Sequence, residues 1–480
     1  MAMLGMRGTG DWIANQRPLN WRETILKLYP NGNAPLTAML SKMSSEKVDD
    51  PAYNWWTEIM TSVQGPVTTT TLVDNAPARS TGTVTLPVRT DAPTPGAMPE
   101  EILGGVTSPN RIAGAAAVAT ATGKPAFRMD SYANSIRVGH QLLLMNTSQS
   151  AWSLNVKVTN VAPQTTGVTI LTVETIEPAQ TVGGISASDA DYFKIIGNIN
   201  PEGGNMPDAI SLDPLQVWNY TQIFRTPLSI TRTARHTRIR TQDQYLRMKA
   251  EALEMHSWEM ELAFLFGQQS MKIASNGFPE RTTRGIANFI KAYAPNNVFD
   301  YVGVNPADII AEGAWTDVTR GIANGQRWFD GAFEQVFRYG AQEKLMFCGS
   351  GAVKAINELA HVGGSINIAP SEKTWGLKVH QWETAFGTVN FITHPLMSLD
   401  PVLRNTGILI EPRELKYRFI DDTRFHGENG LTRAEGTGHD RIDGTKEEFL
   451  TEAGLEFGLP QKCALFYNIG KDRPEPEPEP

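Results

Sequence analysis

The chain of 480 residues has 41% apolar and 20% charged residues and a formal net charge of -8. This balance favours roughly two to four lobes with large buried cores, and it excludes a mostly disordered polymer. The acidic excess argues against a dedicated polyanion-binding protein, since such domains usually carry a strong basic excess.

Few residues could hold a metal, a cofactor or a disulfide framework. The two cysteines, Cys348 and Cys463, fit a reducing compartment, and the sequence has neither a CxxC nor an HExxH motif. We therefore expect no cofactor and no metal. No apolar run approaches the ~20 residues that span a bilayer, and the opening residues lack the apolar core of a signal peptide. These features predict a soluble protein made in the cytosol, with no membrane partner.

The N-terminal residues 1–52 are predicted to form an arm. Two short helices are expected at Trp21–Leu28 and Pro35–Met43, separated by the turn residues of YPNGNAP. Their apolar faces are too short to bury each other, so the arm should lie on a partner surface. The aromatic stretch Tyr53–Met60 then predicts a strand.

Residues 61–127 are rich in Thr, Ala and Pro and carry few charges. This composition is too polar for a core and too uncharged for a solvated tail. We expect an extended β-loop that pairs elsewhere, on another chain; the alternative is a floppy surface loop.

Residues 128–199 are predicted to form a small separate β-module. Four segments, SIRVGHQLLLM, LNVKVTNVAP, GVTILTVET and DYFKIIGNI, alternate apolar and polar positions and are separated by turn residues. Their spacing suits a compact barrel or meander.

A basic stretch, SITRTARHTRIR at residues 229–240, stands out in an acidic chain. We read it as an extended strand. Three interpretations are open: nucleic-acid contact, a solvated strand face, or an ion-pair strip against a neighbouring subunit. In the last case the partner acids would be drawn from Glu251, Glu254, Glu259 and Glu261. Alternation along a strand would divide the arginines between two faces, which weakens a single nucleic-acid groove.

The strongest helix is predicted from Thr241 to Gln268, with Thr241 as its N-cap. It has no Gly or Pro from Gln242 to Phe266. One buried stripe is expected, with three- and four-residue spacing. Its members are Tyr245, Met248, Ala252, Met255, Leu262 and Phe266.

Residues 275–400 are expected to alternate strands and helices. RTTRGIANFI suggests a turn and short strand, Trp315–Phe337 a helix, EKLMFCGS a strand and Gly351–Leu359 a helix. Leu377–Glu383 and Thr388–His394 form a predicted hairpin. TGILIEP and LKYRFI are further strands, and residues 445–469 contain two strands around a turn at Gly458–Pro460.

No catalytic constellation appears. CGSGA at 348–352 lacks the G-x-S-x-G spacing of a nucleophile elbow, and neither phosphate-binding glycine motif is present. IDDTRFHGENG at 420–430 and GTGHD at 436–440 are interpreted as surface loops. The Pro/Glu tail at 471–480 is expected to be an extended, solvated spur.

The order of segments is similar to that of a known family. LYPNGNAPLTAML, YNWWTEIM, FKIIGNINPEGG, NYTQIFRTPLSITRTA, TRGIANFI, WETAFGTVNFITHPLM and KEEFLTEAGLEFGLPQKCALFYNI occur in sequence. This succession resembles tailed-phage major capsid proteins of the Hong Kong 97 fold type, in the group with a β-module inserted in the extended loop.

The resemblance implies an α+β fold with named parts. Residues 1–52 correspond to the N-terminal arm and 53–219 to the extended loop, with the small barrel-like module at 128–199 inserted in it. Residues 220–275 correspond to the peripheral domain with its spine helix, and 276–412 to the axial domain. Residues 413–470 correspond to strands that close the peripheral domain, followed by the acidic tail.

The implied function is a major capsid protein, not an enzyme. It would assemble in the bacterial host cytoplasm into hexamers and pentamers of an icosahedral virion shell around double-stranded DNA. Expected partners are copies of itself, a separate scaffolding protein, a portal, a decoration protein and weakly bound DNA. The candidate intersubunit contact residues are Arg225, Arg232, Arg235, Arg238, Arg240, Trp55 and Trp56.

Two alternatives remain open at this stage. One is a nucleic-acid-binding protein that uses the strand at 229–240, and the other is a carbohydrate-active enzyme with paired carboxylates across a cleft. Lys124 is the only lysine between Lys47 and Lys157. We therefore do not expect the lysine cross-link that some proteins of this fold form.

Overall fold

A computed structural model describes residues 35–40, 45–57, 64–73, 77–87, 132, 135–149, 151–164, 168–207, 209, 215–237, 243–303, 314–319, 322–363, 368–374, 377–429 and 444–471. The chain divides into two compact units. The first unit contains Met1–Tyr53 and Asn219–Pro480, and the second contains Asn54–Trp218. Both chain crossings lie in a two-stranded ribbon of β2 (Ala52–Thr57) and β10 (Leu215–Tyr220).

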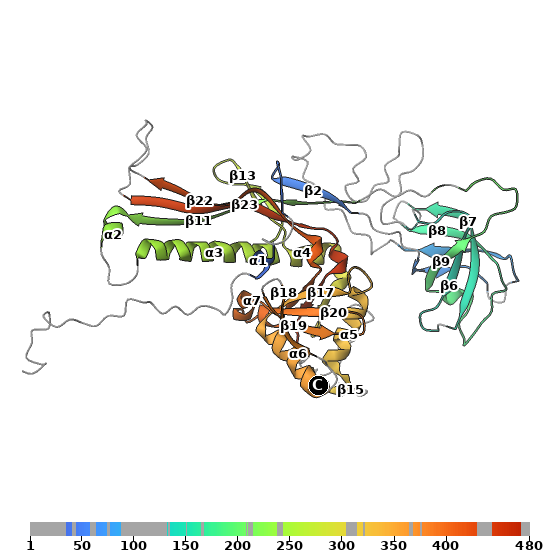
Figure 1. The fold of residues 1–480 in the computed structure, drawn as a ribbon. Helices are drawn as coiled ribbons and strands as arrows, with labels where there is room; N and C mark the ends of the chain where they lie inside the picture. The colour runs from blue at the N-terminus through green and yellow to red at the C-terminus, as the bar shows by residue number, and fades with distance from the viewer. Residues whose placement is uncertain are drawn as a thin grey trace, which may run out of the picture. The chain divides into compact units, whose positions relative to one another are not determined.

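One face of a four-stranded sheet in the first unit is covered by the helix α3, Gln244–Phe266 (Figure 1). The strand order is β1 (Ser45–Lys47), β22 (Leu415–Asn429), β23 (Gly444–Phe457) and β11 (Gln222–Thr231). We call this the α3 sheet. In β11, burial alternates residue by residue because one face packs on α3 while the other faces outward.

A seven-stranded mixed sheet forms the rest of the first unit. Its order is β14 (Val298–Asp300), β24 (Ala464–Tyr467), β21 (Gly407–Ile410), β17 (Glu343–Cys348), β20 (Thr388–Thr393), β19 (Leu377–Glu383) and β18 (Ile368–Thr374). The central strands read as nearly continuous apolar runs because they are buried on both faces.

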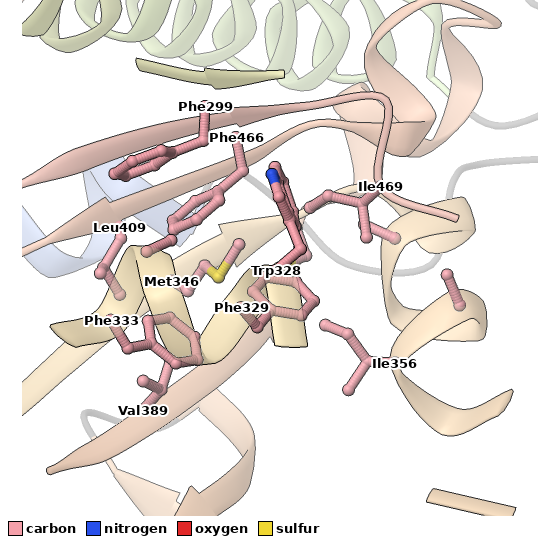
Figure 2. Close-up of a cluster of buried hydrophobic side chains, with 14 of the residues drawn as sticks. Phe299, Trp328, Phe329, Phe333, Met346, Ile356, Val389, Leu409, Phe466 and Ile469 are labelled. Carbon is pink, nitrogen blue, oxygen red and sulfur yellow. The ribbon is translucent and has the colours of Figure 1, made fainter. Parts of the chain in front are cut away.

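Helices α5 (Asn324–Val336) and α6 (Ser350–Gly363) contribute to the core on one face of this sheet. Figure 2 shows Trp328, Phe329 and Phe333 of α5 meeting Phe466 of β24. The Trp328 and Phe466 ring centroids are 5.6 Å apart in an edge-to-face arrangement, which aromatic quadrupoles favour. Smaller elements complete the unit: α1 (Pro35–Leu40), α2 (Arg232–His236), α4 (Ile286–Tyr293), α7 (Pro395–Leu399) and the hairpins β12–β13 (Ser270–Ile273, Pro279–Thr282) and β15–β16 (Val318–Thr319, Ile322–Ala323).

The second unit is built on a seven-stranded sheet of its own. The order is β3 (Gln64–Pro66), β9 (Tyr192–Asn198), β6 (His140–Met145), β7 (Ser153–Pro163), β8 (Thr169–Thr175), β5 (Thr81–Leu86) and β4 (Thr69–Thr70). The edge strands β3 and β4 are separated in the chain by only Val67 and Thr68. The Val67 amide donates to the Asp191 carbonyl at 2.7 Å and the Thr68 amide to the Thr85 carbonyl at 2.8 Å. The sheet therefore curves back until its two edges meet.

This pairing corrects one expectation. The described parts of 61–127, which are 64–73 and 77–87, contribute strands that pair within this chain, not with another copy. Their alternate residues, such as Val84 and Leu86, fill the core of the second unit. Composition alone did not reveal this, because few positions of the segment are apolar, although Val67, Leu72, Val84 and Leu86 are all buried.

The predicted strands of the second unit are confirmed in β6, β7, β8 and β9. In the first unit β17, the β19–β20 hairpin and α6 are confirmed as well. The prediction of two strands within 445–469 is also confirmed, although β23 and β24 join different sheets. The Trp21–Leu28 helix, GTGHD and the tail beyond Lys471 lie outside the described residues.

Three element predictions outside the basic stretch are wrong. The strand expected in RTTRGIANFI is the helix α4, because its buried residues Ile286, Phe289, Ile290 and Tyr293 follow helical spacing. The helix expected from Trp315 begins only at Asn324, after the β15–β16 hairpin. IDDTRFHGENG is not a loop, since β22 continues through Asn429 against β23.

The buried stripe of α3 also differs from the predicted one. Met255 and Leu262 are exposed, at 52% and 40%. The buried positions are Ala252, His256, Met260, Glu261, Phe264 and Leu265. The helix therefore turns two polar side chains inward, which a stripe of apolar residues could not predict. Its N-cap is Asp243, whose carboxylate accepts from the Tyr245 amide at 2.9 Å, whereas Thr241 lies outside the described residues.

Candidate assembly surface

The basic stretch does not form a single strand. β11 ends at Thr231, whose side-chain oxygen accepts from the Ala234 amide, and the helix α2 begins at Arg232. A threonine at this position is a favourable N-cap, so the strand reading of 229–240 is wrong beyond Thr231. Arg232 and Arg235 are three residues apart in a helix and share a face, unlike the alternation that a strand would impose.

Arg225 is paired within its own chain. Its guanidinium donates to Glu448 on β23 through two bonds, from Nε at 2.9 Å and from a terminal nitrogen at 2.7 Å. The hydrogen bonds to Glu448 raise the pKa of Arg225. The pair lies on the face of the α3 sheet that the helix leaves uncovered. The Arg225 side chain is 62% exposed, so water screens the attraction and the pair contributes little to stability.

Arg235 also contacts its own chain. Its guanidinium carbon lies 4.7 Å from the centroid of the Tyr245 ring, a cation–π geometry, and one terminal nitrogen donates to Thr445 at 3.4 Å. The Tyr245 hydroxyl donates to Glu447 at 2.6 Å, and this bond raises the pKa of Tyr245. Through these contacts Arg235 of α2, Tyr245 at the start of α3 and Glu447 of β23 hold the three elements together.

The remaining candidate contact residues differ in their exposure. Arg232 is exposed at the first turn of α2, while Arg238 and Arg240 lie outside the described residues. Trp55 and Trp56 are neighbours in β2 and point to opposite sides, with Trp55 8% and Trp56 62% exposed. Trp56 is thus an open apolar surface, and Trp55 is a buried side chain.

Among the predicted partner acids, Glu261 cannot serve an exposed ion pair. Its side chain is fully buried, and one carboxylate oxygen accepts from the Leu36 amide at 2.7 Å and from His394 Nε2 at 2.8 Å. His394 Nδ1 accepts from the Met397 amide, so the proton of the imidazole resides on Nε2. Glu261 thereby connects α1, α3 and the start of α7.

His256 makes a second buried connection, between α3 and the α3 sheet. Its Nδ1 lies 3.0 Å from the Thr226 hydroxyl on β11, and its Nε2 lies 2.7 Å from the Thr451 hydroxyl on β23. Burial lowers the pKa of His256. Sequence reasoning missed that Glu261 and His256 are buried, because polar residues on an amphipathic helix are normally assigned to its solvent face. Their only sequence signal is position, five residues apart in the second half of the helix.

Exposed apolar side chains occur on several elements of the first unit. Those more than half exposed are Ile223, Leu246, Met255, Ile273, Phe278, Val318, Leu399 and Val402. Single exposed apolar residues are ordinary, but this number on one unit is typical of a surface that binds partners.

No cluster of metal-ligating side chains occurs among the described residues. No helix in the described part of the chain is long and apolar enough to cross a membrane.

Comparison with known proteins identifies the family. The model of the SU10 major capsid protein family matches residues 7–470. The chain is 25% identical over 287 residues to the major capsid protein of Pseudomonas phage PaMx41. That match covers 58% of this chain and 65% of the relative's length, so the chain spans just under two thirds of the curated relative it matches.

Two solved structures resemble the chain over most of its length at low identity. One, from Mycobacterium phage Cain, has a TM-score of 0.40 at 9% identity and covers 95% of this chain and 93% of that one. The other, a capsid of a native GTA particle, has a TM-score of 0.38 at 8% identity and covers 95% and 96%. The family assignment therefore depends on the sequence match across both units, and by that match the chain belongs to the SU10 major capsid protein family.

Proposed function

We propose that this protein is the head-forming subunit of a tailed bacteriophage. It assembles into hexamers and pentamers of an icosahedral shell that encloses double-stranded DNA. The observation that carries the proposal is the family match over residues 7–470, which includes nearly all of both units. The role requires binding between copies and no reaction, so we assign no catalytic residue.

The proposed parts follow the Hong Kong 97 type of fold. We assign an arm at 1–52, an extended loop at 53–219, a peripheral domain at 220–275 and 413–470, and an axial domain at 276–412. The loop assignment is supported by the second unit, Asn54–Trp218, which leaves and rejoins the first through the β2–β10 ribbon. The inserted module, predicted at 128–199, shares its sheet with strands from Gln64–Leu86.

Shell assembly supplies a physical reason for the exposed apolar residues. Stable protein interfaces bury about 1,200–2,000 Å² in total, and a shell subunit needs several at once. Trp56, Phe278 and Val402 expose 62%, 70% and 71% of their surface on three separate elements. We propose that neighbouring copies cover these side chains.

We further propose that the basic segment contacts a neighbouring copy mainly through Arg232, Arg238 and Arg240, and the exposed position of Arg232 on α2 supports this. The contacts of Arg225 with Glu448 and of Arg235 with the Tyr245 ring favour a structural role for these two residues. Packaged DNA is a secondary contact. The nucleic-acid-binding alternative is less favoured, because the net charge is -8 and Arg225 pairs with Glu448 of its own chain.

Charge reversal tests this assignment. Arg232→Glu with Arg238→Glu should abolish shell formation, and the charge-conserving Arg232→Lys with Arg238→Lys should retain most of it. Shells that form normally in the reversed variant but package DNA poorly would overturn the interface assignment and favour nucleic-acid contact.

Electron microscopy of the expressed full chain tests the function itself. Regular shells or capsomers are expected, alone or when a separate scaffolding protein, portal and decoration protein from the same phage are co-expressed in bacterial cytoplasm. A chain that stays monomeric under both conditions would contradict the proposal. Salt-dependent DNA binding by such a monomer would support the alternative.

A further inference from the structure

The tip of the β12–β13 hairpin contains an asparagine–glycine pair in an exposed turn. The sequence has four such pairs, and the structure describes two of them in full, Asn276–Gly277 and Asn324–Gly325. Asn276 is exposed in the turn between the strands, whereas Asn324 is 5% exposed at the start of α5. The two pairs have the same side-chain chemistry, but the asparagine of one is exposed and that of the other is buried.

We propose that Asn276 is a site of spontaneous deamidation and that the fold protects Asn324 from the same reaction. The backbone nitrogen of Gly277 loses its proton and attacks Cγ of Asn276, the bond to the side-chain nitrogen breaks, and ammonia leaves. The resulting five-membered succinimide is opened by water at either carbonyl, giving aspartate or isoaspartate. No oxidant, reductant or enzyme is required.

The turn assists the attack in two ways. Gly277 has no Cβ, so nothing attached to its own Cα hinders the approach of its nitrogen, and its φ of +81° is one that other residues rarely adopt. The Phe278 amide donates to Asn276 Oδ1 at 3.0 Å. Negative charge develops on this oxygen as Cγ becomes tetrahedral, so the donor stabilises the developing charge in the manner of an oxyanion hole.

One contact opposes the reaction and must open first. The Gly277 amide donates to the Ala274 carbonyl at 2.9 Å. The turn closes a ribbon of only two strands, which is marginally stable by itself, and Ile273 and Phe278 beside it are 68% and 70% exposed. Local opening of such a tip costs little free energy.

The side chain of Asn324 and the backbone of Gly325 are both held by hydrogen bonds. Its side-chain nitrogen donates to the Ala314 carbonyl at 3.2 Å, and the Gly325 amide donates to the Trp315 carbonyl at 3.0 Å. A Cβ built on Gly325 would lie 2.6 Å from the Trp315 ring, so the backbone there has no room to move. Attack at Asn324 requires the start of α5 to unpack.

Conversion at Asn276 changes the surface of the hairpin. Aspartate adds a negative charge between the exposed apolar residues Ile273 and Phe278. Isoaspartate also lengthens the main chain by one carbon, which the tight turn cannot absorb without rearrangement. The inference concerns the chain before neighbouring copies cover Phe278, and it does not depend on the proposed function.

The test uses the purified full-length chain incubated at mildly alkaline pH. Trypsin cleaves after Lys272 and Arg281 and after Arg320 and Arg327, so the two asparagines fall in separate peptides, residues 273–281 and 321–327. Digestion in ¹⁸O-labelled water marks any conversion that occurs during preparation. Liquid chromatography with mass spectrometry then separates the aspartate and isoaspartate products.

In the folded chain, Asn276 should convert at least about tenfold faster than Asn324, because Asn324 reacts only after its buried surroundings open. In denaturant the two rates should become similar, and Asn276→Gln should remove the fast conversion. Equal slow rates in the folded chain, or equal fast rates, would overturn the proposal.

Discussion

Replacement of Glu261 by alanine should loosen the helix α1 from the first unit. The carboxylate oxygen that accepts from the Leu36 amide is fully buried, and Leu36, Met39 and Leu40 of α1 are at most 3% exposed. A hydrogen bond to a charged group contributes about 1.5–3 kcal/mol, and its loss here also leaves a buried donor unpaired. Detachment of α1 should therefore become roughly 10- to 150-fold more frequent.

The conservative variant Glu261→Gln separates charge from geometry. The bonds from the Leu36 amide and from His394 Nε2 end on the same oxygen of Glu261, so the glutamine oxygen can still accept both. These two bonds lose their charge assistance, at about 1 kcal/mol, which corresponds to roughly fivefold more frequent detachment.

Amide hydrogen exchange of the peptide containing Pro35–Leu40 measures both effects. Glu254→Gln on the same helix is the matched control, since it removes an equal charge from a half-buried position away from α1. Unchanged exchange in Glu261→Ala would refute the reasoning. Equal acceleration in the alanine and glutamine variants would show that the acceptor oxygen is not what holds α1.

Three further predictions concern the cores of the first unit. Burial lowers the pKa of His256 below its usual 6.5, so as the pH falls the unfolded chain takes up this proton before the folded chain does. The free energy of unfolding should therefore have its full value above pH 6.5 and decrease at lower pH. His256→Gln should flatten this pH dependence, measured by urea titrations between about pH 5 and 8. Burial raises the pKa of Cys463 to about 12 and raises that of Cys348 as well, so neither thiol should react with iodoacetamide until the chain is unfolded, and rapid labelling of the native chain would contradict their placement. Trp328→Ala should cost about 3–5 kcal/mol in denaturant unfolding of the first unit, and a loss under about 1 kcal/mol would show that the aromatic cluster repacks around the cavity.

Some features of this protein were determined by local sequence alone. Glu343–Cys348 forms a strand because its continuous apolar run can only be satisfied by burial on both faces. Ser153–Pro163 and Thr169–Thr175 form strands because alternating residues fill one face of a sheet. The order of such segments was enough to indicate the family, since each is specified by its own residues and the turns beside it.

The tertiary structure decided which side chains are buried and which strands and side chains pair with one another. The same helix α3 could bury either of two stripes, and the α3 sheet and α1 selected the one that contains His256 and Glu261, because both find hydrogen-bond partners there. The polar strands at Gln64–Leu86 acquired a partner only when distant strands supplied open edges. Arg225 was matched to Glu448 across 223 residues of chain. Pairings of this kind depend on the folded positions of both members, and no local pattern contains them.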